Sequence, residues 1–171
     1  MTYEELQKTE LFSFFHFTES GRKPAADGYQ VIHYKPGGFQ EFIDVRMKLD
    51  RSQNIQEGVL YLDRDWIGGP MTVSPFGKDL AKSFIDAICP NVDKEKAGQV
   101  ISTIWNLTGS KDQVIFTKPE ESESAVPIEE LEHVYLGLAE KFELTCEKTC
   151  IKIENVMDVG RKRLKITIKS I

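Results

Sequence analysis

The sequence has little cysteine, proline or glycine, with 3 Cys, 7 Pro and 12 Gly among 171 residues. This composition excludes a disulfide-stapled miniprotein, a collagen-like repeat and a disordered chain rich in proline and glycine. Long hydrophobic runs are missing as well. The most apolar stretch, residues 11–17, is far shorter than the roughly 20 residues of a membrane-spanning helix, so we expect no contact with a membrane.

The sequence does contain enough apolar material for one core. Hydrophobic residues make up 40% of the chain, and 27 acidic against 22 basic residues give a net charge of −5. A chain of this length buries roughly 70% of its unfolded surface, so we expect a single domain over residues 1–171. The odd number of cysteines fits a reducing compartment, and the charged first ten residues carry no export signal. These features predict a cytoplasmic protein.

Strands dominate the elements predicted for the first half of the chain. Apolar and charged residues alternate over residues 41–50, which predicts a strand with one face on the core and one in water. Residues 58–66 predict the return strand of the same hairpin. The phenylalanine run at residues 11–17 predicts a strand that is buried on both faces. The other elements expected here are a short helix over residues 3–10 with a Thr2–Glu5 capping box, a loop at residues 21–24, and a strand over residues 29–34.

Helices are predicted next in the chain. Ser74 and Pro75 have the order of an N-cap followed by a first-turn proline, and apolar residues recur every four positions as far as Ile88. The Cys89-Pro90 pair should end this helix. The other elements expected are a helix from an Asp93 cap to Gly109, a strand over residues 114–117, a solvated loop over residues 118–127, a helix over residues 128–142, and a closing hairpin with arms at residues 151–153 and 164–168.

The order of these elements predicts the fold class. Short connections between strands favour antiparallel pairing, and helices that are grouped in the sequence tend to cover one face of a sheet. We therefore expect an α+β fold, with a mostly antiparallel sheet of about six to seven strands and three main helices, predominantly on one face.

The long hairpin in the first half holds a candidate acid/base site. Counting back from its turn places Arg46 opposite Asp63 and Asp44 opposite Asp65. Opposed carboxylates repel each other, which raises one pKa or recruits a cation. One hypothesis is therefore a small enzyme that uses Asp63 or Asp65 with His33 as acid/base groups. The alternative is that Arg46 neutralises these acids on a solvated sheet face.

Aromatic residues concentrate in the first half of the chain, where nothing ties them to a catalytic group. A concentration of this kind favours a non-catalytic binding module for a small apolar ligand or a protein partner. The sequence therefore favours a non-catalytic binding module, and a small enzyme that uses Asp63 or Asp65 with His33 is the alternative. The residues expected to bind the ligand are Tyr61, Trp66 and Phe84.

Motifs for a cofactor or a metal are missing from the sequence. The glycines do not have the spacing of a phosphate-binding loop, and no serine sits in a nucleophile elbow. Cys146 and Cys150 would lie about 13 Å apart on a strand, without a second pair of zinc ligands elsewhere. Glu130 and His133 match the spacing used in di-iron bundles, but His133 falls opposite the apolar stripe of its helix. We expect no cofactor and no metal.

Basic residues gather at the end of the chain. Residues 148–171 carry seven basic and two acidic side chains, a net charge of +5, which leaves −10 on the remainder. An acidic chain without aromatics interleaved in its basic patch is a poor nucleic-acid binder, so we expect an acidic protein partner. The acidic residues in the range 120–132 would pair with this basic patch within the protein or, from a second copy of the chain, across a homodimer. The residues expected to contact the partner are Lys152, Arg161, Lys162, Arg163 and Lys165.

Overall fold

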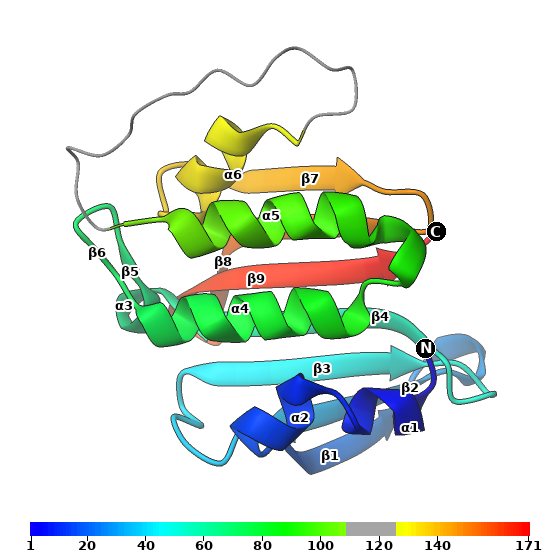
Figure 1. Ribbon diagram of the computed structural model, residues 1–171. Coiled ribbons are helices and arrows are strands. Elements are labelled where there is room, and N and C mark those ends of the chain that lie inside the picture. The colour runs from blue at the N-terminus through cyan, green and yellow to red at the C-terminus, as the bar shows by residue number, and fades with distance from the viewer. Residues whose placement is uncertain (109–125) are drawn as a thin grey trace.

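The computed structural model describes residues 1–108 and 126–171 and is built around one large β-sheet (Figure 1). Its strands are β1 (Thr18–Pro24), β2 (Gln30–Lys35), β3 (Ile43–Leu49), β4 (Ile55–Asp63), β5 (Gly68–Gly69), β6 (Thr72–Val73), β7 (Lys141–Thr145), β8 (Thr149–Asp158) and β9 (Arg161–Ser170). Within the described ranges, seven of them form an antiparallel sheet in the order β1-β2-β3-β4-β9-β8-β7. β5 and β6 pair only with each other.

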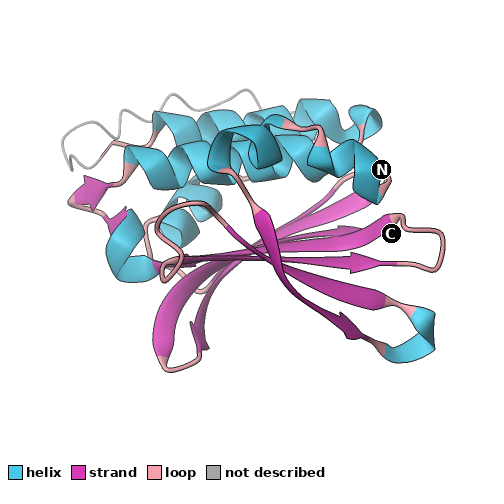
Figure 2. Ribbon diagram, turned by 90° about the horizontal axis from the view of Figure 1, so that it is seen from below, coloured by secondary structure: helices cyan, strands magenta, loops and turns pink. Residues whose placement is uncertain are grey.

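Helices cover one face of this sheet. They are α1 (Tyr3–Gln7), α2 (Glu10–Phe15), α3 (Arg64–Ile67), α4 (Pro75–Ile88), α5 (Lys94–Asn106) and α6 (Ile128–Tyr135), with 3₁₀ turns η1 (Ala26–Gly28) and η2 (Asn91–Asp93). Figure 2 shows the longer helices as one layer, and no described helix forms a second layer on the other side. The predicted α+β fold with an antiparallel sheet and three long helices is confirmed. None of the helices in residues 1–108 and 126–171 is long and apolar enough to span a bilayer.

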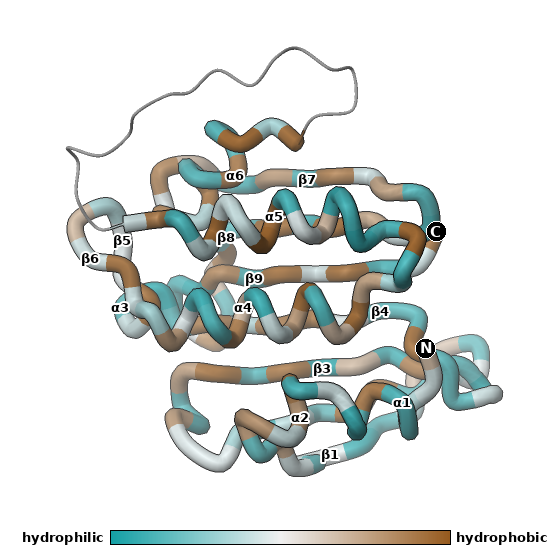
Figure 3. The backbone as a smooth tube through the Cα atoms, in the orientation of Figure 1, coloured by the Kyte–Doolittle hydropathy of each residue, from teal (hydrophilic) through white to brown (hydrophobic). Residues whose placement is uncertain are grey.

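The central strands place their apolar side chains between the sheet and the helices. Alternate residues from Ile43 to Leu49 on β3 are at most 1% exposed, as the sequence predicts. On β4, a Cβ at Gly58 would clash with Ile88, so glycine at this position lets α4 pack close to the sheet. Figure 3 shows hydrophobic segments along β8 and β9 and at intervals along α4.

Several local signals in the sequence are confirmed by the structure. The Ser74 hydroxyl accepts a hydrogen bond from the backbone N–H of Gly77 at 3.3 Å and caps α4, which ends at Ile88 as predicted. The capping box that begins α1 is present as well, although α1 is shorter than predicted. The closing hairpin forms from β8 and β9.

The phenylalanine run at residues 11–17 forms a helix for most of its length, so the predicted strand is wrong. Leu11, Phe12 and Phe15 are buried on α2, whereas Phe14 is 68% exposed. An apolar run this short fits a helix or a strand, and the packing of α2 against α4 decides between them. The first strand is β1, where the sequence predicts a loop. β1 is an exposed edge strand and therefore shows no apolar alternation.

The last helix is shorter than the sequence predicts. α6 ends at Tyr135, and Gly137 follows with a φ of +81°, a conformation that suits glycine after a helix. Phe142 belongs to β7 and is buried there. Phe142 on β7 happens to fall at the helical spacing that the apolar residues of α6 follow. For this reason the sequence pattern does not reveal that the helix ends before β7 begins. The strand predicted at residues 114–117, the helix end at Gly109 and the predicted loop up to residue 125 lie outside the described residues.

Asp93 ties the start of α5 to the turn between β7 and β8. Its carboxylate is buried and accepts hydrogen bonds from the backbone N–H of Glu147 at 2.8 Å, from that of Lys148 at 3.2 Å, and from the Thr149 hydroxyl at 2.6 Å. Asp93 occupies the N-cap position of α5, as the sequence predicts, but its side chain makes no capping hydrogen bond to that helix. Its partners are more than 50 residues away, and local sequence patterns do not reveal them.

Arg64 joins α3 to α6 and β8. Its guanidinium donates hydrogen bonds to the carbonyl of Tyr135 at 2.6 Å and to Asn155 Oδ1 at 2.5 Å. The Asn155 amide in turn donates to the carbonyls of Val134 and Ala139. The last turn of α6 thereby finds partners for its free carbonyl groups, and α3 is held in a fixed place.

We expect Asp93→Ala to lower the free energy of unfolding by about 2–4 kcal/mol, because the buried Thr149 hydroxyl and two backbone N–H groups lose their charged acceptor. Urea unfolding followed by circular dichroism measures this change. The matched control is Asp86→Ala, which removes an exposed carboxylate that pairs with Lys94 and should have little effect. Equal stability of Asp93→Ala and the wild type would contradict the prediction.

Candidate functional site

Side chains that point away from the helices form the uncovered side of the sheet, called here the open face. Because side chains alternate along a strand, residues that are paired across neighbouring strands share a face. The open face carries ten basic and six acidic side chains, assigned from this register. The basic ones are Lys23, Lys35, Arg46, Lys48, Lys141, Lys152, Arg161, Arg163, Lys165 and Lys169, and the acidic ones are Asp44, Glu57, Asp63, Glu143, Glu154 and Asp158.

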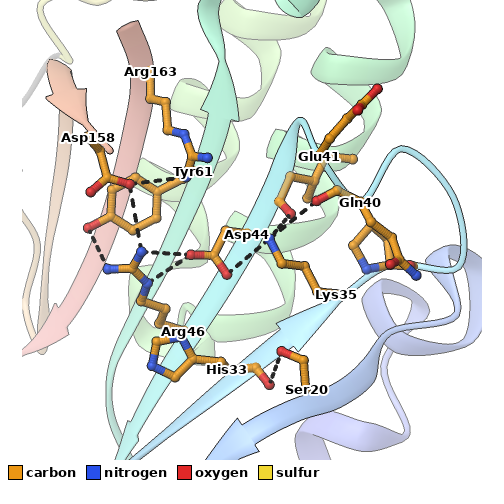
Figure 4. Close-up of polar contacts among 12 residues, drawn as sticks. Ser20, His33, Lys35, Gln40, Glu41, Asp44, Arg46, Tyr61, Asp158 and Arg163 are labelled. Atoms are coloured by element: carbon orange, nitrogen blue, oxygen red, sulfur yellow. Dashed lines mark hydrogen bonds and ion pairs between the residues drawn. The ribbon is translucent and has the colours of Figure 1, made fainter. Parts of the chain in front are cut away.

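A cluster of ion pairs lies at the centre of the open face (Figure 4). Asp44 is only 6% exposed, and its carboxylate lies 2.8 Å from Arg46 Nη2 and 3.6 Å from Lys35 Nζ. Asp158 lies 3.1 Å from Arg163 Nη1 and 3.7 Å from Arg46 Nη2. Both carboxylates are therefore shared by two cations.

The Tyr61 ring lies between the two guanidinium groups of this cluster. The guanidinium carbon of Arg46 is 4.4 Å from the ring centre, and that of Arg163 is 5.9 Å away. Cation–π attraction holds both groups over the ring. Tyr61 is partly buried, and two protein cations contact its ring.

Two titratable groups beside the cluster have shifted pKa values. Burial raises the pKa of Tyr61, and the Arg46 cation opposes that rise. His33 lies directly opposite Arg46 in the sheet. Burial lowers the pKa of His33, with smaller effects from Asp44, which raises it, and from Arg46, which lowers it. The site therefore presents a neutral phenol and a neutral imidazole near pH 7.

The predicted pairing within the β3–β4 hairpin is wrong. Arg46 lies opposite Val59 and Asp44 lies opposite Tyr61, instead of Asp63 and Asp65. An irregularity next to Leu49 and a turn at residues 50–54 shift the register from the one that simple counting predicts. The acids that gather around Arg46 include Asp158 from β8, which no local pattern in the sequence connects to this hairpin.

The structure does not bring the predicted acid/base residues together. Asp63 accepts hydrogen bonds from the backbone N–H groups of Asp65 and Trp66 and pairs with Arg161 at 3.4 Å. It thus caps α3, and Asp65 is exposed on that helix. His33 lies two strands away from Val59, and Asp63 is four residues further along β4 than Val59. The Cα atoms of His33 and Asp63 are therefore roughly 16 Å apart.

The predicted ligand-binding residues are also separated. Tyr61 is on the open face, whereas Phe84 is fully buried on α4 on the other side of the sheet. Trp66 lies on α3 instead of the predicted strand, because the Asp63 carboxylate starts a helical turn there. Trp66 belongs to a different group of aromatic residues, described next.

Six contacting aromatic rings, called here the aromatic patch, are the part nearest the surface of a larger group that continues from Phe15 through Phe17 into the core. Trp66 stacks on Phe42 with an interplanar angle of 4°, and it also contacts Phe39 and Phe76 with ring centres 5.5 and 5.6 Å apart. Phe76 contacts Phe15, which contacts Phe14. The patch comes from α2, the loop before β3, α3 and the first turn of α4. Its members are Phe14, Phe15, Phe39, Phe42, Trp66 and Phe76.

The aromatic patch lies at the end of the molecule where most exposed large apolar residues gather. At this end, called here the apolar end, β4 and β8 stop, β3, β7 and β9 begin, and α4 starts (Figure 1). Phe14 is 68% exposed and Phe39 is 53% exposed. The other exposed apolar side chains at this end are Met71, Trp105, Leu138, Met157 and Val159.

A groove of about 870 Å³ lies at the opposite end, where α4 and β9 stop and β4 begins. Its lining includes Lys8, Lys82, Lys94 and Lys148 beside apolar residues such as Ile88. None of the predicted catalytic or ligand-binding residues lines this groove. The groove thus mixes apolar, basic and acidic residues, and it lies away from every residue that the sequence predicts to bind a ligand.

The cysteines are free and have little thiolate character. Burial raises the pKa of Cys89 to about 12 and also raises those of Cys146 and Cys150. Cys146 lies in the turn before β8 and Cys150 lies on β8, so the prediction that both share one strand is wrong. In the described part of the chain, no group of three or more His, Cys, Asp or Glu side chains is placed to hold a metal ion.

The predicted partner-binding residues lie on the closing hairpin, and most of them are engaged within the protein. Arg163 pairs with Asp158, and Lys152 and Lys165 share Glu154 at 2.7 and 3.8 Å. Arg161 is on the same face, whereas Lys162 alternates to the other side near the hairpin tip. The described acidic residues that the sequence predicts as a counterpart, Glu129, Glu130 and Glu132, lie on α6 on the helix side.

No family model, no curated protein and no solved structure matches this chain.

We expect Arg46→Ala to raise the pKa of His33, because removal of a nearby cation favours the charged imidazolium. Asp44→Asn should lower it, because the stabilising carboxylate charge is lost. An NMR titration of the imidazole Cε1 proton in the wild type and both variants measures these shifts. A shift in the same direction in both variants would contradict the described geometry.

Proposed function

We propose that this protein is a non-catalytic binding module that engages a protein partner through the aromatic patch. The observation that carries the proposal is the concentration of exposed apolar side chains at one end of the molecule, above a packed group of six rings. Soluble proteins seldom expose such groups without a binding role.

The composition and packing of the patch suit a protein interface. Tryptophan and other aromatic residues are enriched at the energetically dominant positions of interfaces. Trp66 and Phe76 are half-buried and fixed by their neighbours, while Phe39 and Phe14 stand out from them. Fixed rings lose little conformational entropy on binding, and burial of an exposed phenylalanine contributes roughly 1.5–3 kcal/mol.

A protein partner fits this surface better than a small apolar ligand does. Ligand pockets are concave and enclose most of a small molecule. The large groove among the described residues lies at the opposite end, away from the aromatic patch, and it mixes charged and apolar residues. Phe39 and Phe14 project from the patch, so a second protein surface would bury them, whereas a small molecule would leave them partly in water.

Site-specific photocrosslinking tests the proposal. Benzoylphenylalanine replaces Phe39 in the protein as it is produced in its own cells, and the adducts formed on irradiation are identified by mass spectrometry. We expect one dominant adduct with a different protein. The affinity of that purified partner should fall at least tenfold in Phe39→Ala, about 1.4 kcal/mol.

The matched control places the same photoreactive residue at Val92, which is 45% exposed on η2 at the other end of the molecule. Position 92 should not yield the same adduct. If position 39 gives no adduct beyond that of position 92, or gives only an adduct with a second copy of the chain, the proposal is wrong.

A further inference from the structure

The open face is positively charged, whereas the rest of the chain is negatively charged. Its ten basic and six acidic side chains give a net charge of +4. Since the whole chain has a net charge of −5, the remaining residues sum to −9. A separation of charge of this size directs an anionic partner toward the open face.

A row of lysines outside the ion-pair cluster supplies much of this excess. Lys23, Lys48 and Lys169 form no ion pair with any described residue. The pairing register aligns them across the sheet on β1, β3 and β9, with one strand between each and the next. Neighbouring Cα atoms in the row are therefore about 10 Å apart. No described carboxylate lies within ion-pair distance of these three cations, so they can attract carboxylates from outside.

We infer that the open face binds an acidic segment of a protein partner, with the lysine row as its main point of contact. Carboxylates spaced along such a segment would meet Lys23, Lys48 and Lys169 in turn. The two guanidinium groups over Tyr61 are already compensated by Asp44 and Asp158, so the lysine row offers the stronger attraction.

The details of the face favour an acidic protein over nucleic acid. Nucleic-acid binding on a sheet depends on aromatic rings that stack with bases. Arg46 and Arg163 lie over the Tyr61 ring and Lys48 lies 4.4 Å over the ring of Tyr29, so a base would have to compete with these cations for both rings. Glu57 also interrupts the lysine row, which a continuous phosphate backbone would meet unfavourably. A protein segment can instead place a neutral or basic residue opposite Glu57.

This binding surface is separate from the aromatic patch. The lysine row lies on the sheet side away from the helices, near the strand ends opposite the apolar end. Binding of an acidic segment at the lysine row is therefore independent of partner binding at the aromatic patch, and a separate experiment tests each.

Fluorescence anisotropy with a labelled glutamate-rich peptide tests the inference. The variant combines Lys23→Gln, Lys48→Gln and Lys169→Gln in the full chain, and thermal unfolding checks that it remains folded. We expect the wild type to bind the peptide at physiological salt of about 0.15 M and the variant to bind about tenfold more weakly.

The control combines Lys8→Gln, Lys82→Gln and Lys148→Gln, which removes the same charge from the groove at the end of α4. This variant should keep the wild-type affinity within about twofold. An equal loss in both variants, no peptide binding by the wild type, or tighter binding of single-stranded DNA or of anionic lipid vesicles at the same salt would overturn the inference.

Discussion

The alternation of side chains along antiparallel strands is the constraint on which the rest of this structure depends. On β3 and β9 the apolar residues occupy one set of alternate positions and most of the charged residues occupy the other. One face of the sheet must therefore be covered to exclude water, and α4, α5 and α6 cover it. The same alternation collects the charged side chains on the other face, which needs no covering layer.

The open face has no covering layer of described helices, but its long side chains can still lie over a neighbouring charged group and bury it. Asp44 is almost inaccessible although no described helix lies over it, since Arg46 and Lys35 lie beside its carboxylate. Burial of an ion pair costs solvation free energy, and the second cation together with stacking on Tyr61 offsets part of that cost. The centre of the open face is thus internally compensated, which leaves the lysines nearer one end of the strands to act on other molecules.

The two surfaces rely on different physical effects. The aromatic patch is apolar, and its Trp66 lies on α3, which Arg64 and Asn155 join to α6 and β8. Its contribution to binding would depend little on salt. Binding at the open face would act through charge, which salt screens over roughly 8 Å. The two proposed surfaces lie apart on the molecule, so binding at one would leave the other accessible.

The elements that short-range physics controls can be read from the chain alone: the alternating strand around Val45, the capped helix that starts at Ser74, the closing hairpin, and hence the α+β class. The binding roles that the sequence suggests for its aromatic residues and for its basic closing hairpin stay predictions. Contacts between distant residues instead make residues 10–15 a helix, place Arg46 opposite Val59, and bring Asp158 to the central cluster. Those outcomes depend on packing and on strand pairing between residues far apart in the chain, and a local pattern carries no information about which distant partner will be there.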